Sequence, residues 1–223
     1  MAFEEHTDIA EKIRTDESAP LRVFSLDGSP CDCVIVAIDG GLRSLAPEIR
    51  PWLCISGINR GPNLSIDVLH SGTVSAAREA SLYGLPSLSV SLATYSHQDY
   101  SQSIEATLAL VERLSHLVTA EPSNILRPEG SRMRPISGTG TNSLRSWFMQ
   151  GNMFLNLNIP ENWNGTFQTV PLGARWYHNA TDMIDQKSTG VAFEVGAARI
   201  VDEEIEMTDC HAIATGSASI TPL

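Results

Sequence analysis

The sequence predicts an α/β protein with a mostly parallel, Rossmann-like sheet flanked by helices and a β-rich C-terminal extension. Three observations favour this class. Short apolar runs alternate with a helix-like run between Leu53 and Leu92, and an amphipathic pattern follows at Gln98–Thr119. Strand-like runs then dominate after Phe154. Alternating strands and helices are typical of parallel sheets, because parallel strands need a crossover connection.

The central stretch carries the clearest strand–loop–helix–strand pattern. Leu53–Ile55 is an apolar run that predicts a buried strand, and a loop rich in Gly, Asn and Ser follows over Ser56–Ser65. A helix-like run covers Val74–Tyr83 and ends at a Gly-Leu-Pro signal that stops helices. Ser87–Leu92 is predicted to be the second strand. Together these segments predict a βαβ unit.

Three small residues, Ser71, Gly72 and Thr73, stand at the expected start of that helix. The first backbone N–H groups of a helix have no helical partner, and the helix dipole attracts anions to them. Gly72 lets an anion approach the backbone, and the two hydroxyls add hydrogen bonds. Ligands of open α/β sheets bind beyond the carboxyl ends of strands, so the adjoining Asn-rich loop supports an anion site. The alternative, in which Ser71 or Thr73 only caps the helix, stays open.

Longer motifs resemble a known family. The segment SGINRGPNLSIDVLHSGTVSAA, at 56–77, is similar to the signature of the SurE-type phosphatases, also called survival protein E or 5′/3′-nucleotidases. Other segments resemble family motifs in the same order: PLRVFSLDGSPCDCV at 20–34, LNLNIP at 155–160, and the close from Thr208 to Leu223. The resemblance implies a metal-dependent phosphatase that hydrolyses nucleoside 5′- or 3′-monophosphates to nucleoside and phosphate.

The resemblance also implies site residues. Asn59 matches a loop asparagine that binds the divalent metal, Mg²⁺ or Mn²⁺, and belongs to the phosphate site. Ser71, Gly72 and Thr73 match the family's phosphate contacts. Asp67 also stands where the family has Asp, which implies a part in shaping the site. The motifs identify no catalytic residue.

The sequence departs from the family near its start. The family opens with a strand that runs into Asn-Asp-Asp-Gly, whose aspartates hold the metal, whereas this sequence has no Asp-Asp pair. We therefore expect the family's N-terminal βα unit to be absent and Met1–Ala19 to form a polar tail. Truncation, a mis-assigned start and a degenerate relative are the three explanations left open. Hard cations prefer carboxylates, so a single amide oxygen at Asn59 predicts weak metal binding and poor hydrolysis.

Two alternatives accompany this interpretation. One is a non-catalytic relative that keeps the anion-binding loop and its oligomer contacts. The other is a dinucleotide-binding Rossmann protein, which the pattern disfavours because no G-x-G-x-x-G follows a strand. A Ser-Gly-Thr-Gly run at 137–140 imitates a phosphate loop but lacks the Walker lysine.

We expect one domain over 1–223, divided into an α/β core at 20–120, a flexible loop at 121–152 and a β-rich extension at 153–223. An amphipathic helix in the core should pack one stripe of apolar residues against the sheet: Ile104, Leu108, Val111, Leu114 and Val118. The resemblance implies that the C-terminal region is an extended arm, which exchanges with a partner subunit to form a homodimer or homotetramer.

Composition limits the partners and the compartment. The net charge of −11 and the pI of about 4.9 argue against nucleic-acid and anionic-membrane binding, and no apolar span is present. A small nucleoside monophosphate is the expected partner. Cys31, Cys33, Cys54 and Cys210 lack zinc spacing, so we expect reduced thiols and a cytoplasmic protein.

Overall fold

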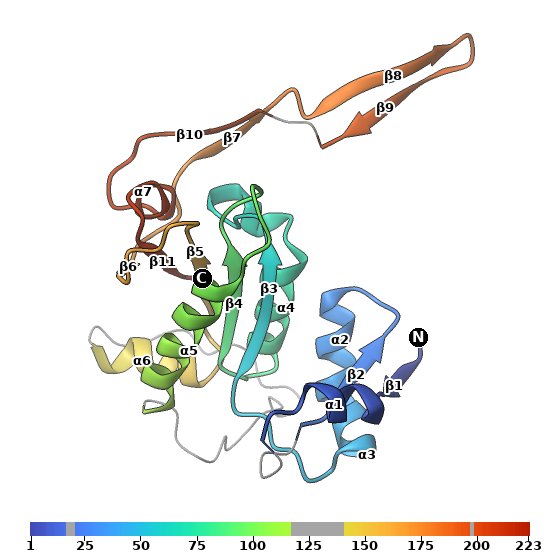
Figure 1. The fold of residues 1–223 in the computed structure, drawn as a ribbon, viewed down its shortest axis with the longest axis vertical. Helices are drawn as coiled ribbons and strands as arrows, with labels where there is room; N and C mark the ends of the chain where they lie inside the picture. The colour runs from blue at the N-terminus through green and yellow to red at the C-terminus, as the bar shows by residue number, and fades with distance from the viewer. Residues whose placement is uncertain (17–20, 117–140, 197–198) are drawn as a thin grey trace.

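The computed structural model describes residues 1–16, 21–116, 141–196 and 199–223. A five-stranded sheet lies at its centre, and three of its four neighbouring strand pairs are parallel (Figure 1). The strands, in spatial order, are β3 (Cys54–Arg60), β4 (Ser87–Leu92), β5 (Leu155–Ile159), β11 (Ala218–Pro222) and β6 (Phe167–Thr169). The α/β class with a mostly parallel sheet is therefore confirmed.

The two predicted strands of the central unit are paired in parallel as β3 and β4. The expected loop begins later than predicted, because β3 does not end before Ser56 but continues to Arg60. Gly57 makes this possible: its φ is +120°, and a Cβ there would lie 2.3 Å from the carbonyl oxygen of Val90. Only glycine tolerates both conditions, so the strand passes a register shift without ending.

The central sheet has one apolar and one polar buried face. Leu88 and Val90 of β4 join β5 and α5 (Ser101–Ser115) in the larger hydrophobic core. The serines of β4 alternate with these residues and are also fully buried, on the opposite face. That second face is covered by α4 (Gly72–Leu82), whose Val74 and Ala77 belong to a smaller core.

Helix α5 is rotated relative to the predicted stripe. Ile104 and Leu108 were expected to pack on the sheet, but they are 50% and 63% exposed. Leu114 is buried as predicted, but the other buried residues of the stripe are Ala106 and Leu110, which lie on the neighbouring helical row. Both rows have helical spacing, and the row with the small Ala106 allows the helix to lie close to the sheet.

The first residues form structure, which corrects the expected polar tail. β1 (Phe3–Glu5) pairs antiparallel with β2 (Phe24–Leu26) in a separate two-stranded sheet, and α1 (Thr7–Ile13) lies between them in the chain. The rings of Phe3 and Phe24 stack with centroids 5.0 Å apart. Because this small contact joins residues that are far apart in the sequence, no local periodic pattern predicts it.

The next helix starts at a capping residue. Ser29 is the N-cap of α2 (Pro30–Val36), and its side chain and that of Asp32 form a capping box. A wider turn at Ala37–Gly41 and the short α3 (Leu42–Leu45) continue the helical path beyond a kink at Gly40.

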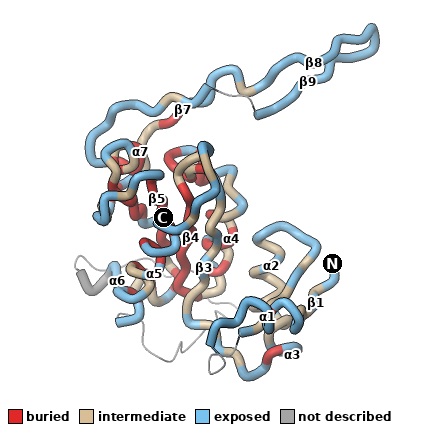
Figure 2. The backbone as a smooth tube through the Cα atoms, viewed as in Figure 1, coloured by how far each residue is buried: buried red, intermediate tan, exposed pale blue. Residues whose placement is uncertain are grey.

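The C-terminal extension contains a long arm. Strand β7 (Arg175–His178) pairs with β10 (Arg199–Asp202), and β8 (Thr181–Lys187) pairs with β9 (Gly190–Val195) in a hairpin. The hairpin projects from the central body, and all its strand residues are exposed (Figures 1 and 2). Helix α7 (Asp209–Ala214) precedes β11.

Part of the expected loop at 121–152 is helical. Residues 141–149 form α6 (Thr141–Met149), and Phe148, which is 4% exposed, packs in the larger core. Burial of this aromatic side chain explains the helix within a segment whose composition indicates a loop. Residues 121–140, including the Ser-Gly-Thr-Gly run, lie outside the described residues.

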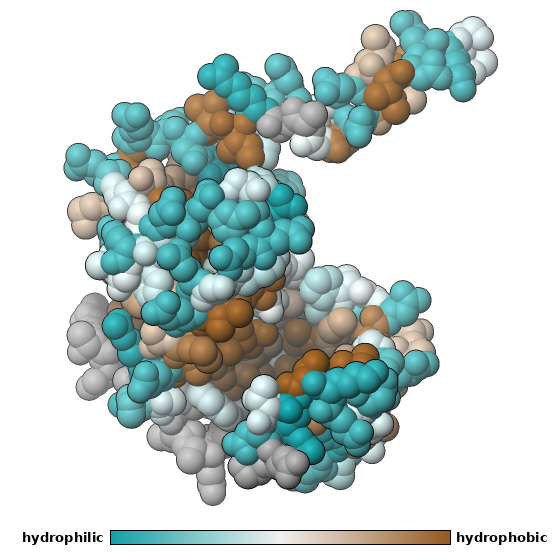
Figure 3. All heavy atoms as spheres, in the orientation of Figure 1, coloured by the Kyte–Doolittle hydropathy of each residue, from teal (hydrophilic) through white to brown (hydrophobic). Residues whose placement is uncertain are grey.

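Apolar surface lines the hollow between the N-terminal elements and the central body (Figure 3). Ile55 of β3, at the edge of the described sheet, is 44% exposed. No helix in the described ranges is long and apolar enough to cross a membrane.

Candidate anion-binding site

The N-terminus of α4 provides the candidate anion site. Ser71 is the N-cap, and its Oγ accepts a hydrogen bond of 3.1 Å from the N–H of Val74. The hydroxyl of Ser71 is therefore used for capping. The N–H groups of Gly72 and Thr73 belong to the first two helical residues, which have no acceptor within a helix. These two donors can meet an anion.

The start of α2 lies directly beside the start of α4. A Cβ on Gly72 would lie 3.1 Å from Cγ of Pro30, so glycine lets the two helix ends approach. Asp32 neutralises the positive end of α2, because its carboxylate accepts from the hydroxyl and the N–H of Ser29 at 2.7 and 2.8 Å. These hydrogen bonds hold the pKa of the Asp32 carboxyl below its usual value. The first turn of α4 has no acidic residue, so its positive end remains available.

Asn59 ties β3 to the loop that follows. Its Oδ1 accepts from Oγ of Ser91 at 2.8 Å and from Nδ2 of Asn63 at 3.1 Å, while its Nδ2 donates to the carbonyl of Gly61 at 2.9 Å. These two bonds use both lone pairs of Oδ1. Coordination of a cation by Asn59 thus requires the release of at least one of them.

Two asparagines of β5 form hydrogen bonds with the same loop. Nδ2 of Asn156 and Nδ2 of Asn158 donate to the carbonyl of Asn63 at 2.8 and 3.1 Å, and Oδ1 of Asn158 accepts from the N–H of Asn63 at 2.8 Å. Both side chains are fully buried. Alternation such as that in LNLNIP is typical of a half-buried strand, but here the polar positions are themselves buried and bind a backbone segment.

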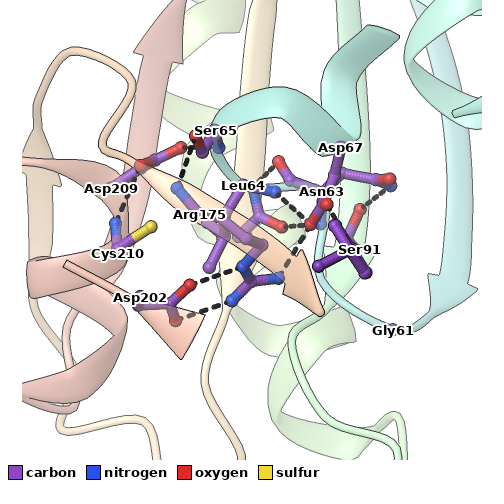
Figure 4. A network of polar contacts seen from close by, with 12 residues as sticks. Gly61, Asn63, Leu64, Ser65, Asp67, Ser91, Arg175, Asp202, Asp209 and Cys210 are labelled. Atoms are coloured by element: carbon purple, nitrogen blue, oxygen red, sulfur yellow. Dashed lines mark hydrogen bonds and ion pairs between the residues drawn. The ribbon is translucent and has the colours of Figure 1, made fainter. Parts of the chain in front are cut away.

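A buried ion pair joins the loop to the arm (Figure 4). Oδ2 of Asp67 accepts from the N–H of Leu64 at 3.1 Å and from Nη1 of Arg175 at 2.7 Å. The guanidinium also donates to both carboxylate oxygens of Asp202 in β10, at 2.6 and 2.8 Å. Arg175 and Asp67 are only 5% and 6% exposed. One cation therefore fixes the loop against two strands of the arm.

A second contact reinforces this attachment. The N–H of Ser65 donates to Oδ2 of Asp209 at 2.9 Å, and its Oγ donates to the carbonyl of Gly173 at 2.8 Å (Figure 4). Ser65 has a φ of 51°, a left-handed conformation that these bonds stabilise. Sequence reasoning did not find Arg175 or Asp209 as partners of the loop, because the contacts span 108 and 144 residues.

The described donors do not fit a tightly held Mg²⁺ or Mn²⁺ ion. The described residues contain no group of three or more His, Cys, Asp or Glu side chains arranged for a metal. Asp67 is already paired with Arg175, and Asn59 offers one neutral oxygen with two hydrogen bonds. Hard cations need several oxygen ligands with negative charge among them. All four cysteines are free thiols.

The fold and this site define an α/β protein with an open helix N-terminus at the carboxyl edge of a parallel sheet. The particular family follows from comparison: a family model described as survival protein SurE matches residues 3–181. The chain belongs to the SurE family.

Individual relatives agree with this assignment. A 5′-nucleotidase SurE from Synechococcus sp. (strain JA-3-3Ab) is 33% identical over 216 residues, which cover 96% of this chain and 70% of the relative. One from Desulforamulus reducens is 34% identical over 214 residues, or 95% of this chain and 71% of the relative. The crystal structure of the SurE protein from Aquifex aeolicus matches 100% of this chain and 73% of that one, with a TM-score of 0.61 and 23% identity. At that identity the structure supports the fold alone.

The Tyr177 hydroxyl gives the loop attachment a pH dependence. It donates to Oδ1 of Asp67, and burial, this hydrogen bond and the nearby negative charge all raise the pKa of Tyr177 above its usual value. Stability from this group is complete below the unfolded pKa of about 10 and is lost as pH rises above it. We expect the free energy of unfolding of the wild type to fall by about 1 kcal/mol between about pH 9 and about pH 11. The fall should be smaller in Tyr177→Phe.

Urea unfolding at several pH values measures this difference. Tyr100→Phe is the matched control, since Tyr100 is the N-cap residue of α5 and does not belong to the hydrogen-bond network of Asp67 in the described residues. Equal slopes in the wild type and in Tyr177→Phe would contradict the prediction.

Proposed function

We propose that this chain binds nucleoside monophosphates with the phosphate at the N-terminus of α4, and that it acts as a phosphoric monoester hydrolase. The observation that best supports this proposal is the pair of helix N–H donors at Gly72 and Thr73, in a first turn that has no acidic residue. The relatives' name, 5′-nucleotidase SurE, supports the substrate class and the 5′ position. Activity on 3′-monophosphates belongs to the same proposal.

In this proposal each part of the site has one task. The N–H groups of Gly72 and Thr73 and the Thr73 hydroxyl donate to phosphate oxygens, which helix N-termini favour. Asn59 keeps the loop against β4 through Ser91 and is the residue present to contribute an oxygen to a metal. The resemblance of the sequence motifs implies that this hydrolysis uses a divalent metal. Because the described donors do not fit a tightly held cation, we assign no step to it and expect weak metal binding and slow hydrolysis.

A non-catalytic, nucleotide-binding relative is the second candidate. The observation that favours it is the double hydrogen bonding of Oδ1 of Asn59, which leaves this oxygen no lone pair for a cation. Both candidates require the same phosphate contacts, and they differ in turnover when Mg²⁺ or Mn²⁺ is added.

Removal of one hydroxyl tests the phosphate site. Thr73→Val keeps the shape of the side chain but loses the donor to phosphate. We expect the Kd for a nucleoside monophosphate, measured by calorimetry, to rise about tenfold, as for a lost hydrogen bond to a charged group. Thr169→Val, at the exposed end of β6, is the matched control and should bind like the wild type.

Two results would contradict this prediction. One is unchanged affinity in Thr73→Val, and the other is a vanadate- or phosphate-soaked crystal with the anion away from Ser71–Thr73. Phosphate release with added Mn²⁺, in the wild type and in Asn59→Ala, then separates the hydrolase from the non-catalytic relative.

We also propose that the arm holds the chain in a homodimer or homotetramer in the cytoplasm. The hairpin β8–β9 exposes Met183, Ile184, Phe193 and Val195, with exposed fractions of 58–76%. Isolated two-stranded hairpins are at best marginally stable, so apolar contacts from a partner would stabilise this one. The free thiols support the compartment.

Substitutions in the hairpin test the oligomer. Phe193→Ser combined with Val195→Ser removes apolar area, so we expect a shift towards monomer in sedimentation velocity. Asp182→Ser on the same hairpin is the control and should keep the wild-type distribution. A monomeric wild type, or an oligomer unaffected by the double substitution, would refute the proposal.

A further inference from the structure

A cavity of about 360 Å³ lies beyond the carboxyl ends of β4 and β5. Its size falls within the usual range for small-molecule pockets. The polar part of its wall comes from two connections, the segment between β4 and α5 and the residues that follow β5. The side chains used below are His97, Asp99, Gln102, Glu161 and Asn162. None of the contacts proposed above for phosphate uses them.

The wall of this cavity is held in place by its own hydrogen bonds. Oε1 of Glu161 accepts from Oγ of Ser96 at 2.8 Å and lies 3.3 Å from Nε2 of His97. The carbonyl oxygen of the Gln102 side chain accepts from the backbone N–H of Trp163 at 3.1 Å, which leaves its amide nitrogen as a donor. The cavity therefore offers oriented acceptors and donors.

The charge of the cavity wall indicates which part of a substrate the cavity binds. Asp99 and Glu161 are both carboxylates, so they disfavour phosphate. The start of α4 favours phosphate, because its first turn has free N–H groups and no acidic residue. Carboxylates accept hydrogen bonds from sugar hydroxyls, as acidic residues do for ribose in dinucleotide-binding folds. The two regions thus have complementary preferences, one for the anion and one for the polyol.

The cavity and the anion loop are physically connected. The N–H of Gly61 donates to the carbonyl of Leu92 at 2.9 Å, and the Arg60 guanidinium donates to the carbonyl of Tyr95. The Tyr95 ring covers Gly61, where a Cβ would lie 2.4 Å from Cε1 of that ring. The segment after β4 therefore runs from the loop after β3 to the cavity wall at His97 (Figure 1). Because neighbouring strands lie about 4.8 Å apart, the ends of β3 and β5 are only ~10 Å apart.

We propose that this cavity is the nucleoside subsite: Glu161, with Asp99, accepts hydrogen bonds from the ribose hydroxyls while α4 holds the phosphate. The exposed Tyr95 ring, between the two regions, offers an apolar face to the base. The inference rests on the proposed function for its substrate class, and it makes Glu161 a residue that determines the preference for ribonucleotides.

Kinetic comparison of three phosphate esters tests the subsite. The esters are adenosine 5′-monophosphate, its 2′-deoxy analogue and 4-nitrophenyl phosphate, each assayed with added Mn²⁺. In Glu161→Gln the ratio of kcat/KM for the ribonucleotide to that for the aryl ester should fall about tenfold, through KM. The preference for the ribonucleotide over its deoxy analogue should fall as well. Glu11→Gln, in exposed α1, should keep both ratios. Unchanged ratios in Glu161→Gln would overturn the inference.

Adenosine binding tests the subsite without turnover or variants. In an NMR titration of the wild-type chain, adenosine should shift the backbone amides of Tyr95, His97, Glu161 and Asn162. Shifts confined to Ser71–Val74, or no shifts at the highest adenosine concentration, would reject the subsite. A chain that binds adenosine at the cavity but hydrolyses no ester would retain the subsite and refute the hydrolase proposal.

Discussion

The buried ion pair between Asp67 and Arg175 determines how the site loop sits on the protein. Asp67 lies in the short helical turn Ser65–Leu69 that leads into α4, and Arg175 lies at the start of the arm. The guanidinium donates to Asp67 on one side and to Asp202 on the other. Loss of Arg175 would leave the buried Asp67 carboxylate without its cation, at a cost of about 3–5 kcal/mol. The ion pair therefore holds the arm and the anion loop together.

The same region explains why the sheet has a polar buried face. Serines of β4 and asparagines of β5 cover the side towards α4. The two asparagine amides bind the backbone of Asn63, and the Ser91 hydroxyl accepts from its side chain. A loop with few apolar side chains gains its position from hydrogen bonds, and each of these is costly to remove once buried. The rigid loop then presents the first turn of α4 on one side and the segment after β4 on the other, where we place the phosphate and the nucleoside.

Local patterns in the sequence predicted the local features. β4, the cap of α2 and the start of α4 follow from apolar runs and capping residues within a few positions. The partners of Asp67 and Ser65 could not be predicted, because they depend on chain segments more than a hundred residues away. The contact of Phe3 with Phe24 was also missed, because it joins two strands separated by a helix and leaves no local pattern. Periodicity also could not choose between two helical rows of α5, since packing of Ala106 against the sheet decides that choice.

Amide hydrogen exchange at Leu64 tests most directly whether the ion pair holds the loop, since its N–H donates to Asp67. Arg175→Met removes the cation and puts an apolar side chain in its place. We predict that exchange of the Leu64 and Ser65 amides becomes about a hundredfold faster in this variant, while that of Tyr83, bonded within α4, changes little. Equal protection of Leu64 in the wild type and in Arg175→Met would contradict the account.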